Sequence, residues 1–251
     1  MSAPRMLVIQ PDSTDPPGPL GEWLIEAGAE LDMRRLPDDA LPAELADYQG
    51  LVCLGGQMNA EDDTRYPWLA DVRRLLSLAA GAGLPTLGIC LGAQLLAVAT
   101  GGRVARGSDG PEAGPGLVAK KDAAWIDPLF AELPLMQDVM QFHADAIEQL
   151  PPGAELLASA PRYPHQAFRL GRCAYGLQFH IETTTAVAKQ WAADAPEVAA
   201  TARDSAFSDE TLAEVHADIA ETWRPFAHRF ARLAAGDLEP AADKRRTLPL
   251  T

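Results

Sequence analysis

The sequence predicts an α/β fold in which helices cover both faces of a mostly parallel sheet, with a small antiparallel element and C-terminal helices. Two observations predict this class. In the first hundred residues, short apolar runs that suit buried strands alternate with segments that carry apolar side chains at helical spacing. Beyond residue 103, shorter apolar runs are separated by polar turns, which suits antiparallel or mixed strands.

The first strands and helices can be recognised in order along the chain. Residues 5–10 (RMLVIQ) form a nearly continuous apolar run that ends at a proline, as expected for a buried strand. Residues 18–29 and 66–83 carry apolar side chains on one helical face, and the second of these segments begins beside Pro67. Further strands are predicted at residues 30–36, 50–56 and 85–90, and a further helix at 91–102.

The second half of the chain is predicted to hold shorter strands and then helices. Helical sequence returns after residue 183, and the end of the chain lacks apolar periodicity. We therefore expect one domain over residues 1–190, a helical extension over 191–235 packed on the same domain, and a weakly packed tail over 236–251. The shorter strands are predicted at residues 116–121, 138–145, 154–160, 166–170 and 173–180.

Composition and charge limit the classes of protein to which this chain can belong. Hydrophobic residues make up 47% of the chain and charged residues 22%, so the chain can bury a large core. The formal net charge of −14 repels phosphate backbones and anionic lipid, so we expect neither nucleic acid nor a membrane as a partner. Residues 75–102 carry no charge, but Pro85 and several glycines divide them into helix, strand and helix. The three cysteines form no C-x-x-C pair, which suits a reducing compartment, and we expect the protein in the cytoplasm.

Cys90 stands between a predicted strand and a predicted helix, in the sequence GICLG of residues 88–92. This G-x-C-x-G pattern is the thiol counterpart of the G-x-S-x-G turn that presents a nucleophilic serine. The glycines relieve crowding in a strained turn, and a helix N-terminus favours the thiolate. The alternative is a small buried side chain, because free cysteines are often buried. The position between strand and helix favours catalysis by Cys90.

A nucleophilic cysteine needs a base and a group that orients the base. His180 and Glu182 are two residues apart at the end of a predicted strand, so their side chains would point to the same face. The carboxylate could then hold one ring nitrogen and leave the other for a partner. The alternative is a pair of side chains exposed to water at a strand end. A metal site is not expected, because no H-x-x-x-H motif or cysteine pair is present.

Gly55 and Gly56 end the strand predicted at residues 50–56. Glycines at this place let the backbone turn its N–H groups toward a developing oxyanion. The stretch contains neither G-K-[ST] nor G-x-G-x-x-G, so it does not match a phosphate-binding loop, and an ordinary turn is the alternative. Because the carboxyl ends of parallel strands meet at one edge of the sheet, we expect these glycines to lie near Cys90.

Together the three clusters resemble the motifs of the class I (triad) glutamine amidotransferases, over residues 45–190. The family motif G-x-C-x-G-x-Q is similar to residues 88–94, H-x-E to residues 180–182, and Gly-Gly to residues 55–56, in the same order. Many members have proline after the two glycines. Here Met58 is similar to the G-G-x-M variant of stand-alone, GMP-synthase-like members.

The resemblance implies a catalytic triad. Cys90 would attack the side-chain amide of glutamine, His180 would relay the proton to the departing ammonia, and Glu182 would orient His180. The resemblance also implies a flavodoxin-like core and a small γ-glutamyl substrate such as glutamine. Chemistry of this kind requires no metal or organic cofactor.

The resemblance further implies residues that contact the substrate. The backbone N–H groups of Gly56 and Leu91 would receive the oxyanion, and Gln94 would contact the substrate. His143 and Asp145, in the sequence FHAD, are similar to an H-G-D-like element near the active site of GMP-synthase-type members.

The sequence leaves the acceptor of the γ-glutamyl group open. We expect a stand-alone hydrolase or transferase that works through a γ-glutamyl thioester, because nothing after residue 190 resembles a synthetase. The alternative within the same chemistry is a glutaminase subunit that supplies ammonia to a separate synthetase partner. An alternative of another class is a non-catalytic binding protein on the same fold. The presence of Cys90, His180 and Glu182 together argues against it.

Overall fold

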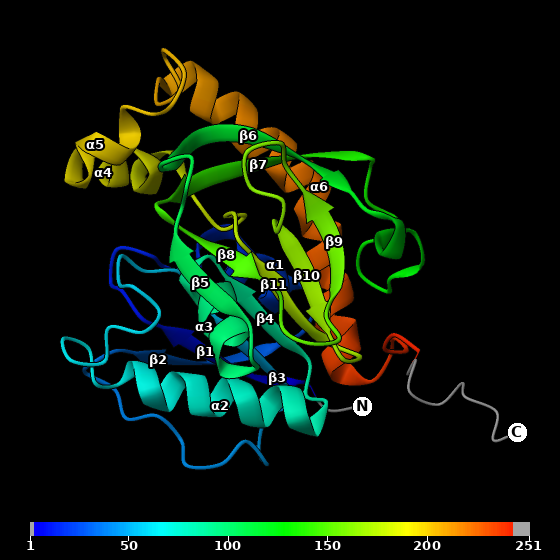
Figure 1. The fold of residues 1–251 in the computed structure, drawn as a ribbon. Helices are drawn as coiled ribbons and strands as arrows, with labels where there is room; N and C mark the ends of the chain where they lie inside the picture. The colour runs from blue at the N-terminus through cyan, green and yellow to red at the C-terminus, as the bar shows by residue number, and fades with distance from the viewer. Residues whose placement is uncertain (1–2, 243–251) are drawn as a thin grey trace, which may run out of the picture.

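The computed structural model describes residues 3–242, which fold around a central sheet of nine strands (Figure 1). Five neighbouring strands are parallel, in the order β2-β1-β3-β4-β11, and the sheet continues antiparallel as β10-β9-β6-β7. The parallel strands are β1 (Arg5–Gln10), β2 (Glu30–Arg35), β3 (Gly50–Cys53), β4 (Thr86–Ile89) and β11 (Ala174–Leu177). The antiparallel strands are β10 (Ala167–Leu170), β9 (Glu155–Ser159), β6 (Glu112–Lys120) and β7 (Met136–His143).

Helices cover both faces of this sheet, as the alternation of side chains along β1 shows. Met6 and Val8 point into a core cluster with α1 and α6, whereas Leu7 and Ile9 point into a second cluster with α2 and α3. The predicted fold class is therefore confirmed. The helices are α1 (Gly18–Glu26), α2 (Leu69–Ala82), α3 (Leu91–Ala99), the 3₁₀ helix η1 (Asp122–Ile126), α4 (Thr185–Asp194), α5 (Pro196–Ala199) and α6 (Asp209–Ala235).

A second, two-stranded sheet pairs β5 (Arg103–Arg106) with β8 (Asp145–Gln149). The strand predicted at residues 138–145 is thereby divided, because the chain bends at Ala144 and leaves the central sheet for this small one. The carbonyl of Ala144 accepts a hydrogen bond from the N–H of Gly107 at 2.9 Å, which holds the bend against the end of β5.

The strand predicted at residues 173–180 ends early, at Leu177. Its parallel neighbour β4 ends at Ile89, where the chain turns into α3, so β4 offers no partner to residues 178–180. His180 instead exchanges two backbone hydrogen bonds with Met140 of β7, at 2.8 and 3.2 Å. The consequence is that His180 sits on a bend between the two halves of the central sheet.

The C-terminal helices lie against the antiparallel part of the sheet and α1 (Figure 1). Of the predicted tail, Ala241 exchanges hydrogen bonds with Arg172 at 2.9 and 3.1 Å, and residues 243–251 lie outside the described residues. Within residues 3–242, no helix combines the length and apolarity needed to cross a bilayer. The uncharged stretch of residues 75–102 is divided among α2, β4 and α3.

Candidate active site

A pocket of about 360 Å³ opens at the carboxyl ends of the parallel strands. Among the residues predicted for the site, those that line it are Gly56, Cys90, Gln94, His143, Asp145 and His180. Glu182 and Leu91 are buried behind the wall, at 2% and 0% exposure. The other lining residues are Thr14, Asp15, Gln57, Met58, Arg106, Phe142, Ala144, Trp191, Asp194, Ala195, Glu197 and Val198.

Cys90 occupies a sharp turn between β4 and α3, with φ +48° and ψ −105°. The turn is crowded on both sides. A Cβ on Gly88 would lie 2.5 Å from the carbonyl oxygen of Gly92, and a Cβ on Gly92 would lie 2.0 Å from that of Cys53. Only glycine fits at either place, which explains the G-x-C-x-G pattern. The N–H of Cys90 donates to the carbonyl of Leu177 at 2.7 Å, which ties the turn to β11.

The three cysteines differ in their surroundings. Cys90 lies in the pocket wall at the N-terminus of α3, where the helix dipole favours a thiolate. Cys53 is the last residue of β3 and has no exposed surface, so burial raises the pKa of its thiol far above the ordinary value. Burial also raises the pKa of Cys173 to about 11, although Arg172 and Arg169 lower it. Cys90 is therefore the one of the three cysteines that lines the pocket.

His180 and Glu182 contact each other as the sequence predicts, although neither lies in a regular strand. Nδ1 of His180 is 2.6 Å from Oε1 of Glu182, and Oε2 of Glu182 accepts a hydrogen bond from the N–H of Ile181 at 2.8 Å. Burial disfavours the charged imidazole, but the Glu182 carboxylate and a hydrogen bond with Cys90 outweigh it and raise the pKa of His180 well above the ordinary value. Nδ1 is thus occupied by Glu182, which leaves Nε2 for Cys90.

The two glycines after β3 bring backbone close to the nucleophile turn. A Cβ on Gly56 would lie 2.9 Å from Cδ2 of Leu91 and 3.1 Å from Sδ of Met58. Leu91 is the first residue of α3, so its N–H has no partner within the helix. Gly56 therefore packs against the first residue of α3, directly after Cys90.

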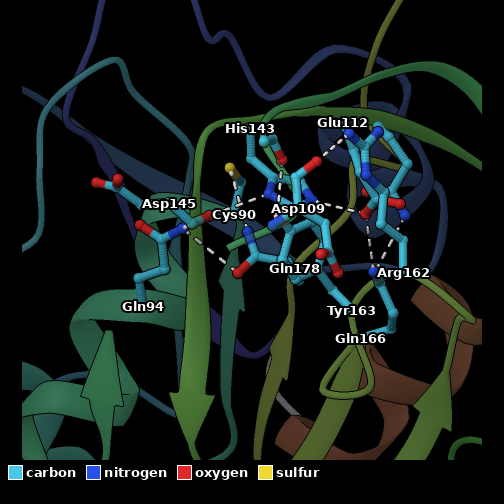
Figure 2. A network of polar contacts seen from close by, with 12 residues as sticks. Cys90, Gln94, Asp109, Glu112, His143, Asp145, Arg162, Tyr163, Gln166 and Gln178 are labelled. Atoms are coloured by element: carbon cyan, nitrogen blue, oxygen red, sulfur yellow. Dashed lines mark hydrogen bonds and ion pairs between the residues drawn. The ribbon is translucent and has the colours of Figure 1, made fainter. Parts of the chain in front are cut away.

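A chain of polar contacts leads away from Cys90, as Figure 2 shows. Nε2 of Gln178 is 3.8 Å from Sγ of Cys90, and Nε2 of Gln94 donates to the side-chain oxygen of Gln178 at 3.3 Å. Nε2 of Gln94 and Nδ1 of His143 both contact the carbonyl oxygen of Asp145, each at 3.0 Å. The structure thus brings Gln94, His143 and Asp145 together, as the motifs predict.

This chain continues beyond the predicted residues. Nε2 of His143 is 3.2 Å from Oε2 of Glu112, which also accepts a hydrogen bond from Gln166 at 3.2 Å. On the other side, the carboxylate of Asp145 accepts a hydrogen bond from Asn59 at 2.7 Å. The loop after β3 and the small sheet are therefore joined across the pocket.

Several residues of the pocket were not predicted from the sequence. Asp15 and Thr14 follow β1, and their place at the carboxyl end of a parallel strand is a signal that could have found them. Trp191 and the α5 residues have no comparable signal, because they reach the pocket from helices after the sheet. Within residues 3–242, no group of three or more histidine, cysteine or acidic side chains is arranged to hold a metal ion.

Comparisons with known proteins agree with this geometry. The family model "Glutamine amidotransferase class-I" matches residues 20–193. The chain is 33% identical over 232 residues to a GMP synthase [glutamine-hydrolyzing] of Thermomicrobium roseum, a match covering 88% of this chain and 38% of that protein. It is 31% identical over 161 residues to gamma-glutamyl peptidase 4 of Arabidopsis thaliana, covering 62% and 63%. The chain thus matches less than two thirds of the length of either relative.

Solved structures show the same relationship. A glutamine amidotransferase of Thermotoga maritima superposes with a TM-score of 0.81 at 30% identity, covering 92% of this chain and 99% of that chain. A glutamine amidotransferase of Methylobacillus flagellatus superposes with a TM-score of 0.78 at 26% identity, covering 97% and 98%. The family model, the relatives and the fold agree, and the chain therefore belongs to the class I glutamine amidotransferase family.

Proposed function

We propose that this protein cleaves γ-glutamyl amides through a γ-glutamyl thioester on Cys90, with Cys90, His180 and Glu182 acting as a triad. The observation that carries the proposal is the meeting of Cys90 and His180 in one pocket, with Glu182 2.6 Å behind the imidazole. A nucleophile, a base and an orienting carboxylate in this order are what acyl transfer through a thioester requires.

In the proposed reaction, the thiolate of Cys90 attacks the side-chain carbonyl carbon of the γ-glutamyl group. The carbonyl oxygen becomes an oxyanion, which the N–H groups of Gly56 and Leu91 stabilise. The C–N bond then breaks, and His180 gives the departing amine its proton from Nε2. Water, or a second amine, next gives a proton to His180 and attacks the thioester, whose C–S bond breaks to release the glutamyl product and restore the Cys90 thiolate beside a protonated His180.

The proposed substrate is a small γ-glutamyl compound such as glutamine. Gln94 and the His143–Asp145 pair would contact its glutamyl part, because they line the same pocket and are held together by hydrogen bonds. Residues of α4 and α5, including Trp191 and Val198, complete the wall around the pocket. A pocket that the chain completes with its own helices supports activity without a partner.

The second candidate function is that of a glutaminase subunit that supplies ammonia to a separate synthetase. It is favoured by the similarity to a GMP synthase that is much longer than this chain. The similarity to a gamma-glutamyl peptidase favours the stand-alone function instead.

The two candidates are separated by steady-state assays on the purified protein. Glutamate release would be followed with glutamine, γ-glutamyl peptides and γ-glutamyl amines, and Cys90→Ala would serve as the inactive control. Turnover below about 0.01 per second on every compound, against the usual 1–10³ per second for enzymes, would exclude the stand-alone function. Recovery of turnover with an added synthetase would then support the subunit function.

A further inference from the structure

The turn between β1 and α1 contacts several parts of the proposed machinery. Oδ2 of Asp12 accepts a hydrogen bond from the N–H of Gln57 at 3.4 Å, beside the proposed oxyanion site. Nε1 of Trp191 donates to the carbonyl of Thr14 at 3.0 Å, and the indole lies against the His180 imidazole with 4.6 Å between ring centroids. The turn is therefore held between the nucleophile side of the pocket and α4.

Asp15 is the residue of this turn whose carboxylate faces the imidazole across Gly55. Its side chain lines the pocket, yet the residue is only 6% exposed. A Cβ on Gly55 would lie 2.3 Å from Oδ2 of Asp15 and 3.0 Å from Cε1 of His180, so the carboxylate and the imidazole both face the place that a side chain at residue 55 would fill. The hydroxyl of Thr14 donates to Oδ1 of Asp15 at 3.4 Å, on the other oxygen.

We propose that Asp15 is a positioning residue for His180, whose carboxylate adds a second negative charge beside the imidazole and stabilises its protonated form. The proposal rests on the proposed function, in which His180 must hold a proton for the departing amine. Glu182 contacts Nδ1, whereas Asp15 approaches from the side of Cε1, so the two carboxylates act from different directions.

The groups around Asp15 determine the pH range in which its carboxylate is charged and can stabilise the protonated imidazole. Burial raises the pKa of Asp15 to about 7; His180 opposes the rise, and Glu182 and Asp12 add to it. The carboxylate therefore gains its charge around neutral pH. The other charged or titratable side chains on the pocket wall are Cys90 on α3, Arg106 on β5, His143 and Asp145 around the bend between β7 and β8, Asp194 on α4 and Glu197 on α5.

A protonated imidazole beside Cys90 favours the thiolate, and the thiolate is the form that reacts with alkylating agents. Ionisation of Asp15 should therefore increase the reactivity of Cys90 as the pH rises through about 7. An asparagine at this position has nearly the same shape but stays neutral at every pH. Below the pKa of Asp15, both side chains are neutral and the two proteins should behave alike.

The test is the rate at which iodoacetamide alkylates Cys90, measured by mass spectrometry from pH 5.5 to 9. The proteins compared are the wild type, Asp15→Asn, and Asp47→Asn as the matched control, because Asp47 is an exposed carboxylate outside the pocket. We expect Asp15→Asn to react at the wild-type rate at pH 5.5 and about tenfold more slowly at pH 8, which corresponds to one pKa unit. Asp47→Asn should follow the wild type throughout.

Two results would overturn the proposal: equal rates for Asp15→Asn and wild type at pH 8, or a rate that is lower by the same factor at every pH. The second result would indicate a purely structural role. Alkylation needs no substrate, so a wild type that releases no glutamate would exclude the stand-alone function and still leave Asp15 tested. If glutamate is released, the kcat/KM values of Asp15→Asn and the wild type should also be equal at low pH. At pH 8, the lower kcat/KM of Asp15→Asn should come from a lower kcat and not from a higher KM.

Discussion

A Cβ on Gly18 would lie 2.1 Å from the carbonyl oxygen of Glu182, so the start of α1 packs backbone to backbone against the segment that carries the proposed triad. Gly18 also has φ +43°, which side chains of L-residues rarely adopt. Because Glu182 in turn contacts Nδ1 of His180, the beginning of α1 helps to determine where the imidazole lies.

The first prediction concerns this contact. Gly18→Ala should force the backbone at Glu182 to move and should lower kcat/KM at least tenfold. The control is Gly28→Ala, because Gly28 also has a left-handed backbone, φ +91°, but no neighbouring atom within 4 Å of a Cβ. Gly28→Ala should lose about 1–2 kcal/mol of unfolding free energy, and Gly18→Ala should lose more because its Cβ also meets the Glu182 carbonyl; both losses are measured in urea. An equal loss of activity in both variants would contradict the role of the contact.

The second prediction concerns cysteine selectivity. A glutamine-like electrophile at pH 7.5 should label Cys90 and leave Cys53 and Cys173 unmodified, because burial raises the pKa of both other thiols. Peptide mapping by mass spectrometry locates the adduct. Labelling of Cys53 or Cys173 in the folded protein would refute the assignment of the nucleophile.

The third prediction separates the base from the group that orients it. His180→Ala should lower kcat/KM by about 10²–10⁴, the usual contribution of a general base. Glu182→Gln should cost less, because it retains the nucleophile and the base and removes only the charge at Nδ1. Circular dichroism and thermal unfolding of both variants serve as the folding control. A loss below tenfold for His180→Ala would count against its proposed role.

The fourth prediction concerns stability and pH. The pKa of Asp15 is about 7 in the folded protein and 3.8 in an ordinary carboxyl group, so the folded state binds this proton more tightly than the unfolded state. The stabilisation that results is fully present below pH 3.8 and is lost as the pH rises through 7. Asp15→Asn keeps a neutral side chain and should therefore be more stable than the wild type at pH 8, by up to about 4 kcal/mol.

Thermal unfolding of wild type and Asp15→Asn at pH 4 and pH 8 checks this prediction. The two melting temperatures should be similar at pH 4, where the residue is neutral in both folded proteins, and should differ at pH 8. A wild type that is the more stable protein at pH 8 would show that the Asp15 carboxylate is better stabilised in the fold than its burial indicates.

The parallel half of the fold was predictable because its signals are local. The apolar run at residues 5–10 coincides with β1, and the glycines around Cys90 mark a turn that only glycine can make. The bend at Ala144 was not predictable, because it depends on pairing with β5. β5 itself, with the sequence RVAR, has two half-buried residues between exposed ends and gives no strong apolar signal.

The candidate site likewise contains residues that local motifs predict and residues that they do not. Cys90 and the pair His180 and Glu182 each stand in a short motif whose spacing has a chemical reason. Asp15 and Trp191 stand in no such motif. Asp15 faces the imidazole from a segment far away in the chain, and Trp191 is held against the imidazole by a hydrogen bond to the equally distant Thr14. These contacts form only in the complete fold, so the residues next to Asp15 and Trp191 in the sequence give no sign of them.

The pocket wall has a further consequence for how its parts can change independently. The groups proposed for bond making and breaking stand at the edge of the sheet and in the bend after β11, whereas Asp194, Glu197 and Val198 come from one short stretch of α4 and α5. A mutation at one of these three residues changes the shape and charge of the wall without altering the strands that position Cys90. Trp191, in the same stretch, lies against the imidazole, so its mutation would change both the wall and the surroundings of the base.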